Sequence, residues 1–289
     1  MFSCVHRKEV HMEENRKNIL PEDYEFNLSD FALFLSVMKN KEAHQCVLSI
    51  IMDEEDLELA EVQVEQVVLN KSGRRAIRLD AWSVDTSDRQ FNVEMQNDTK
   101  NDDVRKRARY TQGLLDTPVL KSGKKTRYRQ LPSTVIIFIT QEDIFGRDMA
   151  KYTFTERCEE IEDLRLEDGT KKIFLNMKSR NGRAELVSLL QYMKRTRLDN
   201  PEITVRDNRL RRLDAIVTEV KQSEEWEAVR MNIWELGIEK GREEGKEEGI
   251  RALIQDNLED GTDRKRIVEK LQKYFSLSEE EAEKALEKF

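Results

Sequence analysis

The sequence predicts an α/β fold in which helices flank a mixed sheet and a helical extension follows at the C-terminal end. Three observations predict it. Residues 76–96 alternate apolar and polar side chains around a polar turn, which is typical of a β-hairpin. Residues 104–116 follow with a helical pattern. Residues 133–140 form a continuous apolar run, typical of a strand that is buried on both faces.

The remaining elements of the core follow in chain order. Capping residues at 27–30 precede the apolar stretch FALFLSVM, and residues 43–52 continue a helical pattern, so one or two helices precede the sheet. Residues 61–69 alternate with period two and predict a first strand, which forms an antiparallel meander with the hairpin. The strand at 133–140 is then reached by a helical crossover. The predicted order is therefore α-β-β-β-α-β.

The C-terminal part of the chain predicts helices. Four glycines recur every four residues among Glu, Lys and Arg, and each costs a helix ~1 kcal/mol, so we expect a linker or a marginal, exposed helix there. The expected segments are a polar lead-in (1–26), a core (27–200), a helical extension (201–236), a Gly-punctuated charged linker (237–249) and a small helical unit (250–289).

Composition excludes several classes of protein. The 289 residues carry a net charge of −8, and 37% of them are charged, so the chain is not a uniformly basic nucleic-acid coat. No apolar run approaches the ~18 residues of a membrane span, and we expect no membrane partner. Cys4, Cys46 and Cys158 form no CxxC pair, which favours a reduced, cytoplasmic setting.

The hairpin brings two acidic residues together. If it folds symmetrically about Ser87, Asp80 lies opposite Glu94, with Cβ atoms roughly 5 Å apart. Strand alternation places Asp80 on the face away from Leu79. Two carboxylates side by side are costly unless a cation lies between them, and a divalent metal ion is the natural candidate. The alternative is an ordinary polar hairpin face in contact with solvent.

A basic segment follows the hairpin directly. Residues 100–129 hold ten Lys or Arg against three acidic residues, a local balance of +7 in a chain of −8. Such a segment beside two carboxylates favours a surface that contacts phosphate groups. The alternative is a solvated basic helix. The side chains that we expect to bind nucleic acid are Arg105, Arg107, Arg109, Lys124 and Lys125.

These segments resemble the PD-(D/E)XK nuclease superfamily, and within it the Rpn-type branch of recombination-promoting nucleases and transposases. The resemblance spans residues 28–250. It rests on RLDAWSVD, FNVEMQ, RARYTQGLLD, VIIFIT, DIFGRDMAKYTF, KKIFLN, ELVSLLQYMK and GIEKGREEGKEEG, taken in this order. It implies a restriction-endonuclease-like αβββαβ core. It also implies a metal-dependent DNA endonuclease that is associated with recombination or transposition.

The resemblance also implies roles for single residues. Asp80 and Glu94 match the two acidic metal ligands, and the Met95 backbone carbonyl is a further ligand for Mg²⁺ or Mn²⁺. Gln96 stands where the superfamily most often has Lys, although Gln is common in this branch. A Gln can orient water but supplies no positive charge beside the phosphate.

Three further positions match less specific features of the family. Arg109 and Tyr110 match a basic and an aromatic residue on the helix after the third strand, and for Tyr110 a core aromatic with a bonded hydroxyl remains the alternative. Glu42 matches an acid that some relatives supply from the first helix. The alternative for Glu42 is a solvated side chain.

Two other functions remain open at this stage. Because Gln96 departs from the general pattern, the chain could be a catalytically silent nucleic-acid-binding or assembly protein that retains the nuclease fold. A carboxylate-pair hydrolase such as a glycosidase is disfavoured, since a sugar cleft needs exposed aromatics and only 7% of the residues are aromatic. A nuclease with one active site per chain would need a homodimer to cut both strands.

Overall fold

The computed structural model describes residues 24–68, 76–99, 102–120 and 127–288. Residues 25–226 form one compact unit and the chain from residue 227 onward belongs to a second, so each unit is described by itself. The first unit contains α2 (Phe31–Met38), α3 (Lys41–Met52), β1 (Leu59–Val68), β2 (Ile77–Asp85), β3 (Gln90–Gln96), α4 (Val104–Asp116), the 3-10 helix η2 (Tyr128–Gln130), β4 (Thr134–Thr140), β5 (Lys151–Phe154), β6 (Thr170–Asn176), α5 (Ala184–Lys194) and α6 (Asn208–Lys221).

The strands form one six-stranded mixed sheet in the order β1-β2-β3-β4-β6-β5. β1, β2 and β3 form an antiparallel meander, β3, β4 and β6 are parallel, and β5 pairs antiparallel with β6. Helix α4 lies in the crossover from β3 to β4. The predicted α/β class, mixed sheet and element order are therefore confirmed. β4 is buried along its whole length, as its uninterrupted apolar sequence predicts.

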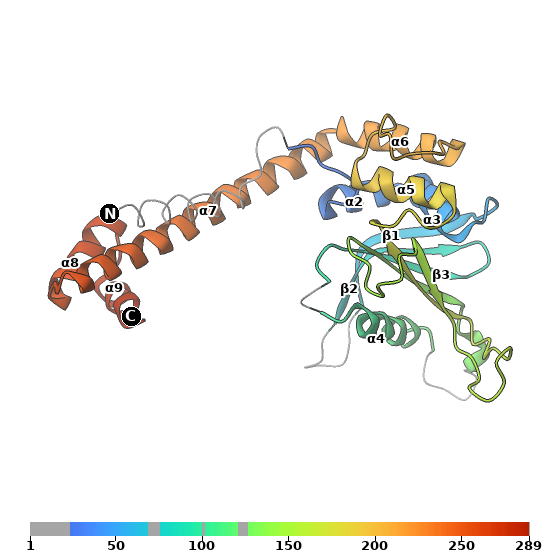
Figure 1. Ribbon diagram of the computed structural model, residues 1–289, viewed down its shortest axis with the longest axis horizontal. Coiled ribbons are helices and arrows are strands. Elements are labelled where there is room, and N and C mark those ends of the chain that lie inside the picture. The colour runs from blue at the N-terminus through green and yellow to red at the C-terminus, as the bar shows by residue number, and fades with distance from the viewer. Residues whose placement is uncertain (1–23, 69–75, 100–101, 121–126, 289) are drawn as a thin grey trace. The chain divides into compact units, whose positions relative to one another are not determined.

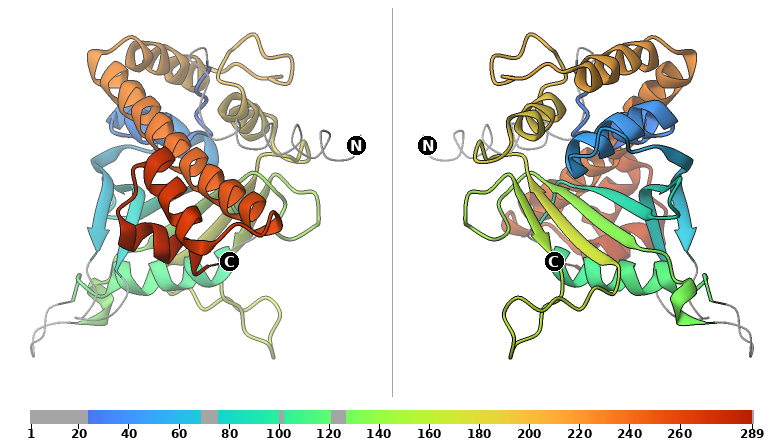
Figure 2. Two further views of the ribbon diagram at one scale, coloured as in Figure 1. Left: turned by 90° about the vertical axis from the view of Figure 1, so that its left-hand side faces the viewer. Right: turned by 90° about the vertical axis from the view of Figure 1, so that its right-hand side faces the viewer.

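Helices cover both faces of the sheet. α2, α3, α5 and α6 lie on one face and α4 lies on the other (Figure 1; Figure 2). Asp103 caps α4 by accepting hydrogen bonds from the backbone N–H groups of Arg105 and Lys106, a contribution of about 1 kcal/mol. Val104 and Ala108 of α4 then pack in one apolar cluster with strands β2, β4 and β6. This packing fixes which side of α4 faces the sheet.

The predicted alternation along β2 is wrong at one point. Leu79 belongs to the same apolar cluster as Trp82 and helix α4, rather than to the opposite face. Arg78, its neighbour, lies over the ring of Phe31 in α2 at 5.5 Å from the centroid. The partner strand is distorted at this level, because Glu65 has a φ of 53°. No residue is inserted here, because the ladder pairs Val64 with Ala81 and Gln66 with Leu79 in one register. The two-residue period on which the prediction depended is nevertheless interrupted between Leu79 and Trp82.

The second unit is helical. Helix α7 (Glu224–Glu259) enters it from the first unit, and α8 (Arg264–Phe275) and α9 (Glu279–Leu286) follow. Its core consists of Ile254, Ile267, Leu271, Ala282 and Leu286. Residues 237–249 are helical within α7, and a Cβ at Gly249 would lie 2.9 Å from the Phe275 ring. In the described residues no helix combines the length and the apolar character needed to cross a membrane.

Candidate functional site

The β2–β3 register brings two acidic side chains together on adjacent strands. Ala81 pairs with Val93, and the same register places Asp80 beside Glu94, as the sequence predicts. Asp80 Oδ2 accepts a hydrogen bond of 3.1 Å from the backbone N–H of Met95. Asp80 is 5% exposed and Glu94 is 1% exposed. Two carboxylates at this depth are stable only where charge or hydrogen bonds compensate them.

Arg107 compensates Glu94. Its Nη2 donates to Glu94 Oε2, and its Nη1 donates to Gln96 Oε1 at 2.7 Å. The other oxygen of Glu94, Oε1, accepts from Asn92 Nδ2 at 2.9 Å. The guanidinium also lies 5.6 Å from the centroid of the Phe138 ring. Both oxygens of Glu94 are therefore hydrogen-bonded, one to a neutral amide and one to a cation.

Asp80 is less well compensated than Glu94. Burial, together with the neighbouring Glu94 carboxylate, raises the pKa of Asp80 to about 7. The Met95 N–H bond and the charge of Arg107 act in the opposite direction but do not cancel the effect. A carboxylate held at such a cost beside a second acid is a common feature of functional sites, and a bound cation would lower that cost.

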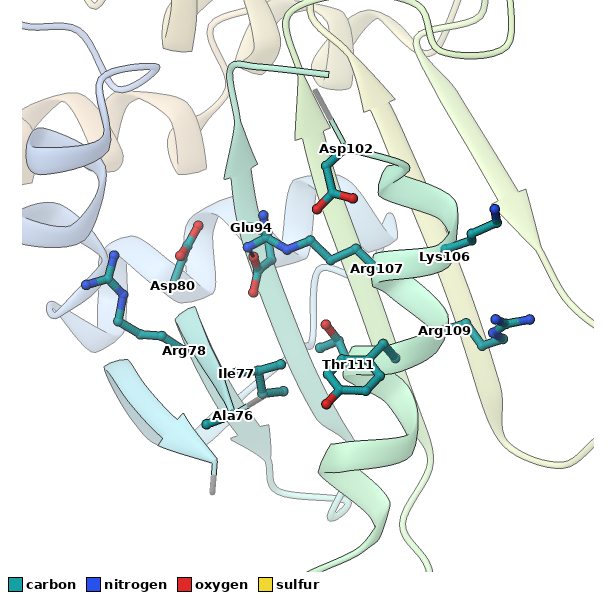
Figure 3. A pocket seen from close by; sticks show the side chains of 11 residues that line it. Ala76, Ile77, Arg78, Asp80, Glu94, Asp102, Lys106, Arg107, Arg109 and Thr111 are labelled. Atoms are coloured by element: carbon teal, nitrogen blue, oxygen red, sulfur yellow. Dashed lines mark hydrogen bonds and ion pairs between the residues drawn. The ribbon is translucent and has the colours of Figure 1, made fainter. Parts of the chain in front are cut away.

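The two carboxylates line a pocket of about 560 Å³ between the sheet and α4. Arg107 extends from α4 towards Glu94, whereas Arg109 points away from both carboxylates (Figure 3). The lining residues are Ala76, Ile77, Arg78, Asp80, Glu94, Asp102, Lys106, Arg107, Arg109, Tyr110 and Thr111. The pocket thus combines buried negative charge with a cationic wall from α4.

The donor set suits a hard divalent ion in part. The Asp80 and Glu94 carboxylates are the oxygen donors that Mg²⁺ and Mn²⁺ prefer, and the Met95 carbonyl belongs to the same strand as Glu94. Within the described ranges there is no group of three or more His, Cys, Asp or Glu side chains suited to a metal ion. A metal ion here would depend on two carboxylates, and Glu94 would have to exchange Arg107 for the ion.

The other predicted site residues lie at several different places. Glu42 forms an ion pair with Arg212 at 2.7 Å and belongs to α3, on the face of the sheet opposite α4. Arg105 pairs with Asp103 at 3.1 Å and does not line the pocket. Tyr110 lines the pocket and is 40% exposed. Lys124 and Lys125 lie outside the described residues.

Two contacts of Glu94, with Asn92 and with Arg107, were not predicted, although the spacing of these residues indicates them. Asn92 precedes Glu94 by two residues, so both side chains share a face of β3. Arg107 follows Val104 by three residues and precedes Thr111 by four, which places it beside the stripe of α4 that faces the sheet. Arg109, which the family pattern favours, lies on another side of the helix. Helical spacing therefore indicates better than the family motif which Arg contacts Glu94.

Comparisons of the chain with protein-family models, with curated proteins and with solved structures gave no match.

Proposed function

We propose that this chain is a metal-dependent nuclease of the PD-(D/E)XK type that hydrolyses phosphodiester bonds in DNA. One observation carries the proposal: Asp80 and Glu94, buried on adjacent strands, line a pocket whose opposite wall is cationic. A phosphodiester is an anion that a cationic wall attracts, and paired carboxylates can hold the hard metal ion that such hydrolysis uses.

The arrangement of elements supports the finer proposal of a restriction-endonuclease-like core. Two helices precede an antiparallel meander, and a helix then crosses over to a parallel, fully buried strand. The two carboxylates come from the second and third strands of the meander, as in the family that the sequence resembles. An Rpn-type role in recombination or transposition, and a homodimer for cutting both strands, belong to the same proposal.

The side chains of the pocket have distinct tasks in this reaction. Asp80 and Glu94, with the Met95 carbonyl, would hold Mg²⁺ or Mn²⁺. When bound there, the ion polarises the scissile phosphate and lowers the pKa of an attacking water. Arg107 binds a phosphate oxygen through its planar fork of donors. Gln96 lies next to the lining residues, where its Oε1 accepts from Arg107 and its Nε2 donates to the Asp98 carbonyl, so its task is to hold Arg107. Hydrolysis leaves one phosphate and one hydroxyl.

The test is the nicking of supercoiled plasmid with Mg²⁺ or Mn²⁺. We expect EDTA to abolish nicking and Asp80→Asn to slow it at least about a hundredfold, since loss of a ligand exceeds the effect of losing an outer-shell partner. Asp88→Asn is the matched control, because Asp88 is an exposed residue in the turn of the same hairpin. Nicking that persists in Asp80→Asn would place the reaction elsewhere.

A second candidate function is favoured by a specific contact. Arg107 already neutralises Glu94 and bonds Gln96, so one of the two carboxylates has its counter-charge without a metal ion. A catalytically silent nucleic-acid-binding protein would have the same geometry. Binding of single- or double-stranded DNA without nicking in either metal would favour this function over the nuclease.

A further inference from the structure

Arg107 and a metal ion would compete for the same atom. Arg107 Nη2 donates to Glu94 Oε2, which is the oxygen of Glu94 that Asn92 does not hold. A divalent ion needs that electron pair and is repelled by a guanidinium beside it. Glu94 Oε2 can therefore accept a hydrogen bond from Arg107 or coordinate a metal ion, but it cannot do both in the same geometry.

The Arg107 side chain can also bind a partner other than Glu94. Its side chain is 33% exposed and lines the pocket, so its guanidinium can turn without leaving the site. Its two acceptors are both side-chain oxygens, of Glu94 and Gln96. A phosphate group offers the same pair of acceptor oxygens together with a negative charge, and guanidinium groups bind it in a bidentate manner.

Glu94 remains oriented when Arg107 leaves. Asn92 is fully buried on the same face of β3, and its Nδ2 donates to Glu94 Oε1 at 2.9 Å. This bond leaves Oε2 as the oxygen whose partner can change. The carboxylate would thus keep its position in the pocket while it exchanges one cation for another.

We propose that Arg107 is a phosphate-binding residue that exchanges partners. In the structure it neutralises Glu94, and when a phosphodiester binds it moves to the phosphate and frees Glu94 Oε2 for the metal ion. This inference rests on the proposed function, since it requires a pocket that takes both a phosphodiester and a metal ion. Thermodynamic linkage then makes phosphodiester and metal ion strengthen each other's binding.

Mn²⁺ binding to the full chain tests the exchange without any measurement of activity. Free Mn²⁺ is followed by its EPR signal, with and without a dithymidine phosphonate in which a methylene group replaces the bridging 5′ oxygen, so that the analogue keeps both non-bridging oxygens and resists hydrolysis. We expect Arg107→Gln to bind Mn²⁺ alone on the order of tenfold more tightly than the wild type. The same variant should bind the dinucleotide more weakly, and the dinucleotide should strengthen its Mn²⁺ binding by a smaller factor.

The matched control is Arg197→Gln. Arg197 also pairs with a carboxylate, Asp199, at 3.0 Å and lies outside the pocket, so the variant loses the same charge without touching Glu94. We expect it to follow the wild type. If Arg107→Gln does not fold, Arg107→Met retains an apolar side chain beside the Phe138 ring but has no charge, and it should bind Mn²⁺ more tightly than the wild type.

The outcomes separate this inference from the proposed function. Equal Mn²⁺ affinities for the wild type and the folded Arg107 variant overturn the exchange. If the wild type and the Arg107 variant bind Mn²⁺ equally and Asp80→Asn abolishes Mn²⁺ binding, the exchange is overturned but the proposed metal site stands. If no variant binds Mn²⁺, with or without the dinucleotide, the proposed function falls together with the exchange.

Discussion

Two clusters with the same composition involve strand β2. The open cluster is Asp80, Glu94 and Arg107; the closed cluster is Glu54, Asp85 and Arg89. Each contains two acids and one Arg. In the closed cluster Arg89 contacts both carboxylates, with Nε at 2.6 Å from Asp85 Oδ2 and Nη2 at 2.6 Å from Glu54 Oε2. In the open cluster Arg107 contacts Glu94, whereas Asp80 accepts from a backbone N–H.

The two clusters differ in which parts of the chain supply the hydrogen-bond partners of their carboxylates. Asp85 Oδ1 accepts from the backbone N–H groups of Ser87 and Arg89, so the turn itself closes the cluster, as expected of a turn aspartate. The open cluster instead draws on β2, β3 and α4 and borders a pocket. A cluster whose charges are all paired stabilises the fold, whereas a cluster with a raised carboxyl pKa beside a pocket is a candidate functional site.

The largest expected difference between the open and the closed cluster is in how the free energy of unfolding depends on pH. Because the folded state raises the pKa of Asp80 from 3.8 to about 7, it holds a proton that the unfolded chain has lost between these values. The contribution of Asp80 to the free energy of unfolding is fully present below pH 4 and is lost as the pH rises towards 7. The total loss is on the order of 4 kcal/mol.

The measurement is urea unfolding of the wild type and Asp80→Asn from pH 4 to 8. Subtracting the two profiles removes other titrations, including that of His44, whose burial lowers its pKa to about 4 and which acts in the opposite direction. Parallel profiles for the two proteins would contradict the assignment of a protonated Asp80.

Arg89→Gln should give the next largest effect. It leaves the buried Asp85 and the half-buried Glu54 without their cation, which should lower the free energy of unfolding by about 3 kcal/mol. Urea unfolding at pH 7 measures it, and plasmid nicking per folded molecule should stay unchanged. A loss below about 1 kcal/mol would mean that the closed cluster does not stabilise the fold.

Asn92→Ala should have the smallest effect of the three. It removes the amide that orients Glu94 Oε1 while leaving both carboxylates in place. We expect Mn²⁺ affinity to fall about tenfold, the usual cost of losing a partner that orients a ligand. The EPR titration of free Mn²⁺ measures it. An unchanged affinity would show that Arg107 or the strand alone orients Glu94.

Local patterns predicted most of the fold. Period-two alternation predicted the strands of the meander, symmetry about Ser87 predicted the register of the hairpin, and the uninterrupted apolar run predicted β4, because these features depend on neighbours in the sequence. The side of β2 that Leu79 faces was not predictable in the same way. Leu79 packs with helix α4 next to a local irregularity of the β1–β2 pair, where Glu65 has a positive φ, and a two-residue period carries no signal of such an irregularity.

The sequence by itself determined that Asp80 and Glu94 meet, since hairpin register follows from a short turn. Tertiary structure decided which cation reaches them. Packing of Val104 and Ala108 against the sheet sets the rotation of α4, and the crossover sets its position along β3. Arg107, rather than Arg109, therefore contacts Glu94. Helical spacing places Arg107 beside the side of α4 that faces the sheet, but the level at which α4 crosses β3 depends on contacts between segments that are distant in the sequence.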